Sequence, residues 1–335
     1  MSSSALPKSG APVKSTGLHK GDIAPGVAKV DPIIIADNVS RTFGGLTAVD
    51  VAHLEIPRNA ITALIGPNGA GKTTLFNLLT GFDKPDTGSW TFDGQSLSGV
   101  PAFRVARLGQ VRTFQLTKAL GLLTVLDNMK LGAKGKAGEG FFRSLLPFLW
   151  RKQDDEIEVR AMEILKKFKL DTKADDYAAS LSGGQRKLLE MARALMSEPR
   201  LVMLDEPMAG VNPALTQSLL DHILDLKTQG MTVLFVEHDM QMVSHIADWV
   251  VVMAEGKVVS EGPPDIVMKD PAVIDAYLGA HIDTDLGVVT GRHADPNAAA
   301  TTITAEEITA AGIAEAEEVE PEVKPKRSAK KEAQK

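Results

Sequence analysis

A glycine-rich segment at residues 66–74 constrains the fold of this chain more than any other feature. An apolar run at 61–65 precedes the segment and leucines at helical spacing follow it, which predicts a strand, a tight loop and a helix. Backbone N–H groups of such a loop form a nest for phosphate oxygens at a helix N-terminus. The segment therefore predicts a nucleoside triphosphatase. Its residues are Gly66, Pro67, Asn68, Gly69, Ala70, Gly71, Lys72, Thr73 and Thr74.

Two side chains of this loop have chemistry suited to a nucleotide. Lys72 supplies an ammonium charge for the phosphates, and Thr73 supplies the hydroxyl that such loops place on a magnesium ion. A chance glycine-rich turn is the alternative. The spacing, with a strand before the loop and a helix after it, makes that alternative the weaker one.

Composition narrows the remaining possibilities. The 335 residues are 44% hydrophobic, which is enough for one large core or two modest ones. There is no cysteine, so disulfides and cysteine metal sites are excluded. The net charge of −6 and the 5% aromatic content give no general attraction for nucleic acid, and we expect no nucleic-acid partner. No apolar run approaches the roughly 20 residues that a membrane-spanning helix needs.

The chain divides into three parts by composition. Residues 1–31 are rich in Ser, Pro and Gly and poor in large apolar side chains, which predicts a disordered arm. Residues 280–335 are first acidic and then basic, which predicts a disordered charged tail. The segment 32–279 carries the strand and helix patterns. Within it, helix-period apolar positions indicate an α-helical subdomain at about 116–180.

The strands before and after the phosphate loop predict a small antiparallel sheet. Two strands lead into the loop strand, and residues 81–94 suggest a hairpin with its turn near Asp86. Phe43, on a glycine-flexed segment, could stack on a purine or be an ordinary core residue. The aromatic run at 141–150 could rest on a membrane or partner, or pack within its own subdomain.

Three polar clusters follow the helical segment. Ser182, Gly183, Gly184 and Gln185 open an amphipathic helix, either as a simple cap or as an anion site awaiting a partner. Asp205 and Glu206 end a continuous apolar strand, where one carboxylate can hold magnesium and the other accept a proton from water. A second apolar strand ends at His238. Parallel strands deliver such residues to one edge of a sheet, where open α/β sheets bind ligands.

These motifs, taken in order, resemble the ATP-binding subunit of ABC transporters. The resemblance covers about 32–279. It implies an α/β fold with a P-loop NTPase core, a small antiparallel β subdomain and an inserted α-helical subdomain. It also implies that Phe43 stacks on adenine, that Gln115 contacts Mg²⁺ and the lytic water, and that His238 holds the γ-phosphate. Ser182, Gly183, Gly184 and Gln185 would then close on the ATP of a second subunit in a head-to-tail dimer.

Within that family the chain looks most like the ATPases of branched-chain amino acid importers. The features are Phe43-Gly44-Gly45, the segment 206–213 with Asn212, and the closing segment 270–279. The resemblance implies permease subunits, a second ATPase subunit and, indirectly, an extracytoplasmic substrate-binding protein as partners. It implies a peripheral location at the cytoplasmic face of the plasma membrane. Another cargo (urea, short amides or an exported lipid), a soluble ABC protein of translation or DNA repair, and a nucleotide-gated module without turnover are the alternatives.

Overall fold

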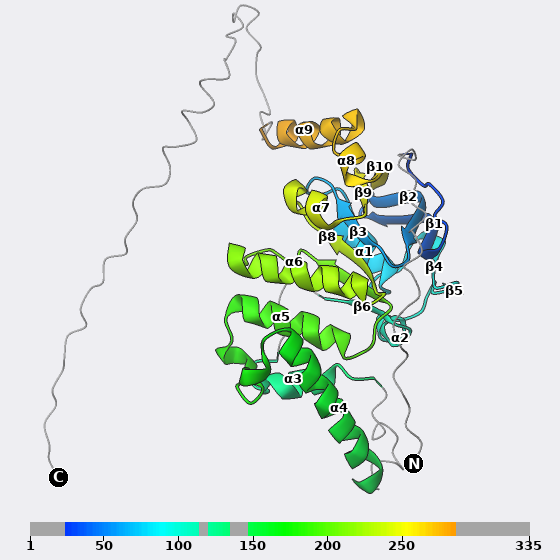
Figure 1. Ribbon diagram of the computed structural model, residues 1–335. Helices are drawn as coiled ribbons and strands as arrows, with labels where there is room; N and C mark the ends of the chain where they lie inside the picture. Colours follow the sequence, from blue (N-terminus) through cyan, green and yellow to red (C-terminus); the bar gives the residue numbers. More distant parts are fainter. Residues whose placement is uncertain (1–23, 114–119, 135–146, 286–335) are drawn as a thin grey trace, which may run out of the picture. The chain divides into compact units, whose positions relative to one another are not determined.

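The computed structural model describes residues 24–113, 120–134 and 147–285. These residues form two β-sheets with helices packed around them (Figure 1). The smaller sheet is antiparallel, in the order β2-β1-β4-β5, and the larger has the order β10-β9-β3-β8-β7-β6. The strands of the smaller sheet are β1 (Pro32–Phe43), β2 (Leu46–Pro57), β4 (Thr87–Phe92) and β5 (Gln95–Ser96). Those of the larger are β3 (Ile61–Ile65), β6 (Gln110–Arg112), β7 (Leu201–Asp205), β8 (Thr232–Val236), β9 (Trp249–Ala254) and β10 (Lys257–Gly262).

Helices occupy most of the connections between strands of the larger sheet. They are α1 (Lys72–Leu79), α2 (Ala102–Arg107), α3 (Val125–Leu131), α4 (Pro147–Lys167), α5 (Gly183–Leu195), α6 (Pro213–Thr228), α7 (Met240–Ile246), α8 (Pro264–Val267) and α9 (Pro271–Asp285). The connections make β3, β6, β7, β8 and β9 parallel, while β10 returns antiparallel to β9. Parallel strands with helical connections are typical of an α/β fold.

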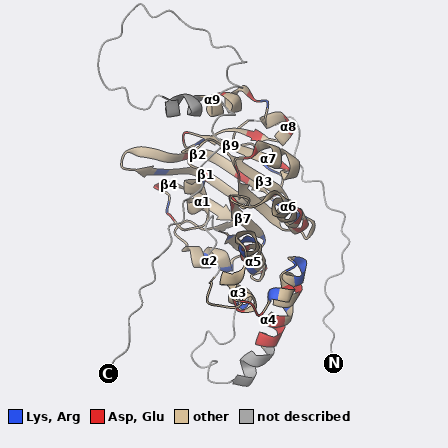
Figure 2. Cartoon of the chain, turned by 90° about the vertical axis from the view of Figure 1, so that its left-hand side faces the viewer, with Lys and Arg blue, Asp and Glu red and all other residues tan. Residues whose placement is uncertain are grey.

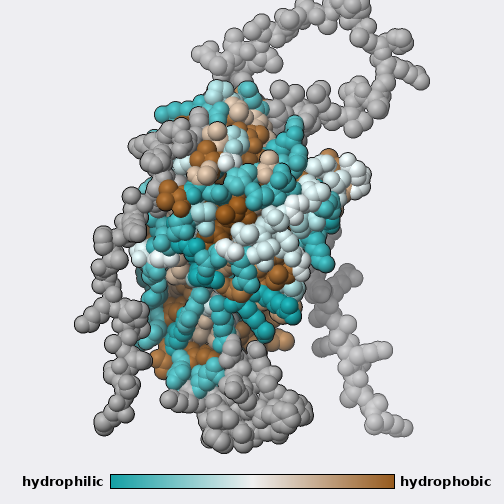
Figure 3. Space-filling view, turned by 90° about the vertical axis from the view of Figure 1, so that its right-hand side faces the viewer, coloured by the Kyte–Doolittle hydropathy of each residue, from teal (hydrophilic) through white to brown (hydrophobic). Residues whose placement is uncertain are grey.

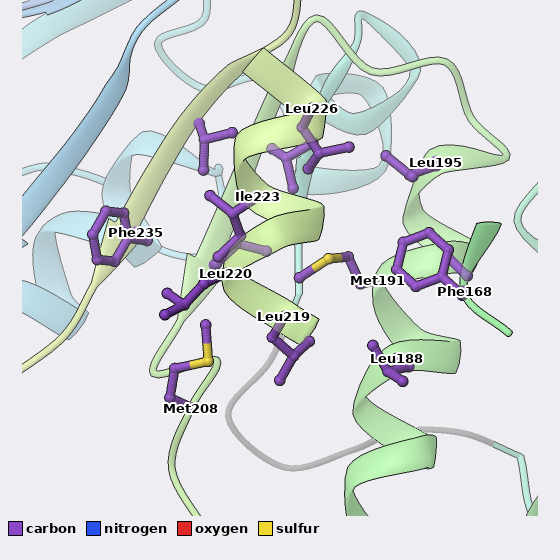
Figure 4. Packing of buried hydrophobic residues seen from close by; sticks show 14 of the residues in the cluster. Phe168, Leu188, Met191, Leu195, Met208, Leu219, Leu220, Ile223, Leu226 and Phe235 are labelled. Carbon is purple, nitrogen blue, oxygen red and sulfur yellow. The ribbon is translucent and has the colours of Figure 1, made fainter. Parts of the chain in front are cut away.

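The larger sheet is buried on both faces. Alternate residues of each strand enter different cores: Leu64 packs with the smaller sheet and α1, whereas Ile65 packs with the helices of the opposite face. The strands therefore carry continuous apolar runs instead of the alternating pattern of a half-exposed sheet. On the helical face, Ile223 of α6 lies toward Phe235 of β8, and Met191 of α5 lies between α5 and α6 (Figure 4).

Three helices form a group of their own beside the larger sheet. α3, α4 and α5 pack on one another (Figure 1). Basic residues and acidic residues both occur along the described part of α4 (Figure 2). Leu188 and Met191 of α5 are buried in a core that contains Leu165 of α4 as well as residues of β3, β7 and β8, so α5 joins these helices to the larger sheet.

The hairpin predicted at 81–94 does not form within that range, and a short hairpin lies a few residues further on. Its strands are β4 and β5, which pair Phe92 with Gln95, so the chain reverses at Asp93 and Gly94. Both residues have positive φ, 51° and 75°, as the two central residues of a type I′ turn require. Thr87 and Gly88, expected to be part of the turn, instead begin β4.

The surface of the described residues is mixed. Figure 3 shows one face, on which apolar side chains lie in small groups between polar ones. Scattered apolar groups of this kind are normal on folded proteins. In the part of the chain that the structure describes, we find no helix with the length and apolar character needed to cross a bilayer.

Residues 24–31 are held in place, although the composition placed them in a disordered arm. The buried carboxylate of Glu261 accepts hydrogen bonds from the backbone N–H groups of Gly26 and Val27 at 2.6 and 3.0 Å. Its second oxygen accepts from Lys29 Nζ and Trp249 Nε1, both at 2.9 Å. The Lys29 ammonium also lies 4.5 Å from the centroid of the Trp249 ring. One carboxylate thus fixes a segment whose own composition gives it little apolar surface to bury.

We expect Glu261→Ala to lower the free energy of unfolding by about 3–5 kcal/mol, because it leaves the buried Lys29 ammonium without its counter-charge. Chemical denaturation of the full chain measures the change. Asp155→Ala, at an exposed position of α4, is the control and is expected to stay within about 0.5 kcal/mol of the parent chain. A loss from Glu261→Ala no larger than that of the control would contradict the role given to this ion pair.

Candidate functional site

The phosphate loop joins β3 to α1, as the sequence predicts. Two of its glycines are required by space as well as by backbone conformation. A Cβ on Gly66 (φ 149°) would lie 2.1 Å from the carbonyl oxygen of Met253, and one on Gly71 (φ 94°) would lie 2.2 Å from that of Ala48. Gly71 is also the residue before the first turn of α1. The loop can therefore lie against the neighbouring backbone only with glycine at these positions.

Lys72 is the first residue of α1, and its side chain folds over the loop. Its Nζ donates to the carbonyl oxygens of Gly66 and Pro67 at 2.7 and 2.8 Å. Burial lowers the pKa of Lys72, and the charges of Glu206 and Asp205 partly oppose that shift. The ammonium is therefore close enough to both carboxylates to interact with them electrostatically, so the structure brings two separate sequence motifs together.

The carboxylates stand at the end of β7, two strands away from the loop strand. In the order β3-β8-β7 the strands are parallel, so their carboxyl ends share an edge. Asp205 is the last residue of β7 and is buried. Glu206 follows with φ 46°, a left-handed conformation that is uncommon for a residue other than glycine. Its N–H donates to the carbonyl of Val236 at 3.1 Å, which ties the turn to β8.

The structure adds Arg112, which the sequence analysis did not identify as a site residue. Its Nη2 donates to Asp205 Oδ2 at 2.6 Å and its Nη1 donates to Asn77 Oδ1 at 2.6 Å. The two side chains of the Arg112–Asp205 pair are almost fully buried. Arg112 thereby orients Asp205 and links β6, β7 and α1. The sequence does show that Arg112 ends a strand-like segment. Its pairing with Asp205 could not be predicted, because that requires knowing that β6 lies beside β7.

A third carboxylate, that of Glu237, supports the turn after β7. Glu237, after β8, is 1% exposed and accepts the N–H of Met208 at 3.0 Å. Burial raises the pKa of Glu237, while the hydrogen bonds from the backbone of Met208 and His238 oppose the shift. The next residue, His238, differs sharply because its side chain is 70% exposed, with Nδ1 3.7 Å from Glu237 Oε2. His238 is thus placed at the sheet edge with its ring in solvent.

The segment 182–185 starts α5 as a reciprocal cap. Ser182 Oγ accepts the N–H of Gln185 at 3.2 Å, and Gln185 Oε1 accepts the N–H of Ser182 at 3.0 Å. Ser182 and Gly183 are exposed. The cap satisfies only part of the first turn, so the N-terminus of α5 still presents N–H groups and a positive dipole to solvent.

Two predicted site residues remain to be placed. Phe43 ends β1 with its ring 48% exposed and the Arg41 guanidinium 4.7 Å from the ring centroid. It is therefore not a core residue of the smaller sheet, which was one of its two interpretations. Gln115 lies outside the described residues, three positions beyond the end of β6.

The loop between β3 and α1, the carboxylates after β7 and the histidine after β8 define a P-loop ATPase whose cassette carries an extra helical unit. A family model described as "ABC transporter" matches residues 49–209, and one described as "Branched-chain amino acid ATP-binding cassette transporter" matches residues 257–283. The second match covers β10, α8 and most of α9.

Similar proteins and structures agree with this class. The chain is 42% identical over 248 residues to the probable branched-chain amino acid transport ATP-binding protein LivG of Archaeoglobus fulgidus, covering 74% of this chain and 96% of that protein. It is 39% identical to the high-affinity LivG of Escherichia coli, covering 74% and 98%. A crystal structure of a nucleotide-free ATP-binding cassette from an ABC transporter is 36% identical, covers 73% of this chain and 98% of that one, and has a TM-score of 0.64.

The chain belongs to the ATP-binding subunits of ABC transporters, and it is an ATPase. The family resemblance found from the motifs is confirmed. The predicted fold class, with a P-loop core, a small antiparallel subdomain and an inserted helical subdomain, is confirmed as well.

Proposed function

We propose that this chain hydrolyses ATP to drive the import of branched-chain amino acids. The names of its relatives support this cargo, and so does the match of residues 257–283 to the branched-chain family model. The observation that carries the proposal is the nearly complete coverage of those relatives, 96% and 98% of their length, including the segment that closes the cassette.

The residue roles follow from the chemistry at the sheet edge. Gly66 to Thr74 bind the phosphates through backbone N–H groups, with Lys72 contributing charge. Glu206, which follows β7 at the same sheet edge as the loop, accepts the proton of the attacking water, and His238 donates to the γ-phosphate from its exposed position. Phe43, exposed at the end of β1, stacks on the adenine. Phosphoryl transfer depends mainly on positioning and charge stabilisation, which a rigid sheet edge supplies.

Magnesium fits the donors at this edge. Thr73 offers a hydroxyl, Asp205 a carboxylate that Arg112 orients through Oδ2, and Gln115 would add an amide oxygen. Mg²⁺ prefers such oxygen ligands and completes its shell with water and phosphate oxygens. Among the described residues no cluster of three or more His, Cys, Asp or Glu could hold a metal. When bound, the ion would neutralise charge on the phosphates.

The exposed start of α5 supports a head-to-tail dimer. Its N–H groups and dipole form an anion site. We propose that Ser182, Gly183, Gly184 and Gln185 close on the γ-phosphate of ATP held by a second ABC ATPase subunit, either a copy or a sibling. Closure of the dimer would move the helical group and transmit the nucleotide state to integral-membrane permease subunits. An extracytoplasmic substrate-binding protein would deliver the cargo.

The location and domain limits are part of the same proposal. The chain would lie at the cytoplasmic face of the plasma membrane, held there by its permease partners. We retain 32–279 as the cassette, preceded by the strap at 24–31 that Glu261 binds. The disordered arm was predicted at 1–31 and the disordered tail at 280–335; residues 24–31 are instead held by Glu261, residues 280–285 continue α9, and the rest of both segments lies outside the described part.

Uptake of labelled leucine, valine and urea tests the cargo. In cells lacking this chain, we expect the wild-type chain to restore leucine and valine uptake, and the Glu206→Gln chain to leave it at the background level because transport needs turnover. Urea is the matched control and is expected to enter equally in all three strains. Restoration of urea uptake alone would assign the cassette to amide transport. No change for any of the three solutes would show that the cargo is a different compound.

A further inference from the structure

Lys187 lies in the second turn of α5, five positions after the cap residue Ser182. Glu190 and Met191 follow it at the i+3 and i+4 positions, so the three side chains share one face of the helix. That face is directed at the end of β7. Together with Asp205 and Glu206, the three side chains line a small cavity of about 20 Å³, which is room for a single water molecule.

The ammonium of Lys187 contacts the backbone of the turn that carries Glu206. Its Nζ donates to the carbonyl oxygens of Ala209 and, at 3.2 Å, of Pro207. The carbonyl oxygen of Glu206 lies at 3.5 Å, a longer and weaker contact. An ammonium has three N–H donors, so this one turn can engage all of them. All of these acceptors are backbone carbonyl oxygens, so the contact depends on the conformation of the turn and not on any side chain in it.

This turn needs external support. Glu206 has φ 46°, and a left-handed conformation of a non-glycine residue costs of order 1–3 kcal/mol unless its surroundings impose it. The Glu206 N–H donates to Val236 at the end of β8, and the Met208 N–H donates to the buried Glu237. Both of these anchors belong to the sheet. Lys187 is an anchor that comes from the helical group.

Electrostatics agree with this placement. Burial lowers the pKa of Lys187, and attraction to Glu237, Glu190 and Glu206 opposes the shift. The carboxylates thus offset part of the cost of burying this cation, although the pKa of Lys187 stays below its usual value. The contact therefore joins the start of α5, where the exposed 182–185 segment lies, to the turn after β7 by a charge-assisted link.

We propose that Lys187 is a positioning residue for ATP hydrolysis: it holds the 206–209 turn so that the Glu206 carboxylate is aimed at the attacking water, and it makes that aim depend on the position of α5. The inference rests on the role proposed above for Glu206. Movement of α5 relative to the sheet would pull on the turn directly. The hydrogen bonds described for Lys187 all go to the 206–209 turn, so its effect passes through Glu206.

The test is steady-state ATP turnover of the full-length chain carrying Lys187→Met, which keeps the apolar stem and removes all three donors. We expect kcat to fall about 10- to 100-fold, the loss that follows from misplacing a catalytic group by about 1 Å, with the KM for ATP within about twofold of wild type. Lys187→Gln keeps two N–H donors on a shorter stem and is expected to retain an intermediate kcat. Lys166→Met, at an exposed position of α4, is the matched control and should turn over normally.

A double-mutant cycle distinguishes positioning of the Glu206 carboxylate from general stabilisation of the protein by Lys187. In the Glu206→Gln background, single-turnover hydrolysis should change less than about twofold on adding Lys187→Met, because the carboxylate being positioned is already gone. An equal loss in both backgrounds would overturn the proposal, as would a wild-type kcat for Lys187→Gln. If Glu206→Gln alone turned over normally, the proposed role of Glu206 would fail first. Normal turnover of Lys187→Met together with an inactive Glu206→Gln would refute the role of Lys187 and leave the role of Glu206 intact.

Discussion

Glu206→Gln is expected to slow ATP hydrolysis by about 10²- to 10⁴-fold, the usual contribution of a general base, while ATP still binds. Glutamine has the size of glutamate, so the 206–209 turn and its bonds to Val236 and Lys187 should persist. The phosphate loop is untouched, and so is Asp205 with its Arg112 partner. Only proton acceptance is lost. Phosphate release measures turnover, and equilibrium binding of labelled ATP measures affinity.

Two further variants, one a control and one a contrast, test this interpretation. Glu163→Gln removes a carboxylate from an exposed position of α4 and should leave both quantities unchanged. Asp205→Asn, by contrast, would disturb the buried pair with Arg112 and the magnesium ligand together, so it should weaken binding as well. Rapid turnover by Glu206→Gln would assign the base to another group at the same edge. A parallel loss of binding would show that the substitution had disturbed the turn instead.

The part of this site that lies in contiguous motifs was predictable from sequence. Gly66 and Gly71 both have positive φ, a local backbone requirement that glycine meets and that makes the loop pattern visible in the sequence; their close approach to Met253 and Ala48 is a second reason, which depends on the fold. Asp205 ends a continuous apolar run, and such a run indicates a parallel strand buried on both faces. Strong local constraints of this kind are visible in a single sequence.

The parts that depend on which strands and helices meet were not predictable. Arg112 and Asp205 are far apart in sequence and pair because β6 lies beside β7. Lys187 had no local pattern that distinguished it from a solvated helix lysine. Residues 24–31 looked disordered because their composition is poor in apolar side chains, yet the buried carboxylate of Glu261, more than 230 positions away, supplies what they lack. Contacts between segments distant in the chain decided each case.

Lys72→Ala is expected to weaken ATP binding by about 10- to 100-fold, since hydrogen bonds to a charged group contribute about 1.5–3 kcal/mol. Hydrolysis should be lost along with binding. The structure gives a second reason for a large effect, because the ammonium also bonds the carbonyls of Gly66 and Pro67 and thus shapes the loop itself. The positive charge of Lys72 also interacts with the carboxylates of Asp205 and Glu206, so its removal leaves their negative charges less compensated. Titration with a fluorescent ATP analogue measures the affinity.

The two reasons predict different behaviour for Lys72→Arg. Arginine keeps the positive charge, but its planar guanidinium cannot donate in the same directions as an ammonium. If charge alone mattered, Lys72→Arg would bind ATP nearly as well as wild type; because the loop contacts also matter, we expect it to bind less tightly, between wild type and Lys72→Ala. Lys84→Ala, at an exposed position beyond α1, serves as the control with unchanged affinity. Normal ATP affinity for Lys72→Ala would refute the phosphate-loop assignment, because no other lysine of the described loop could take over the charge.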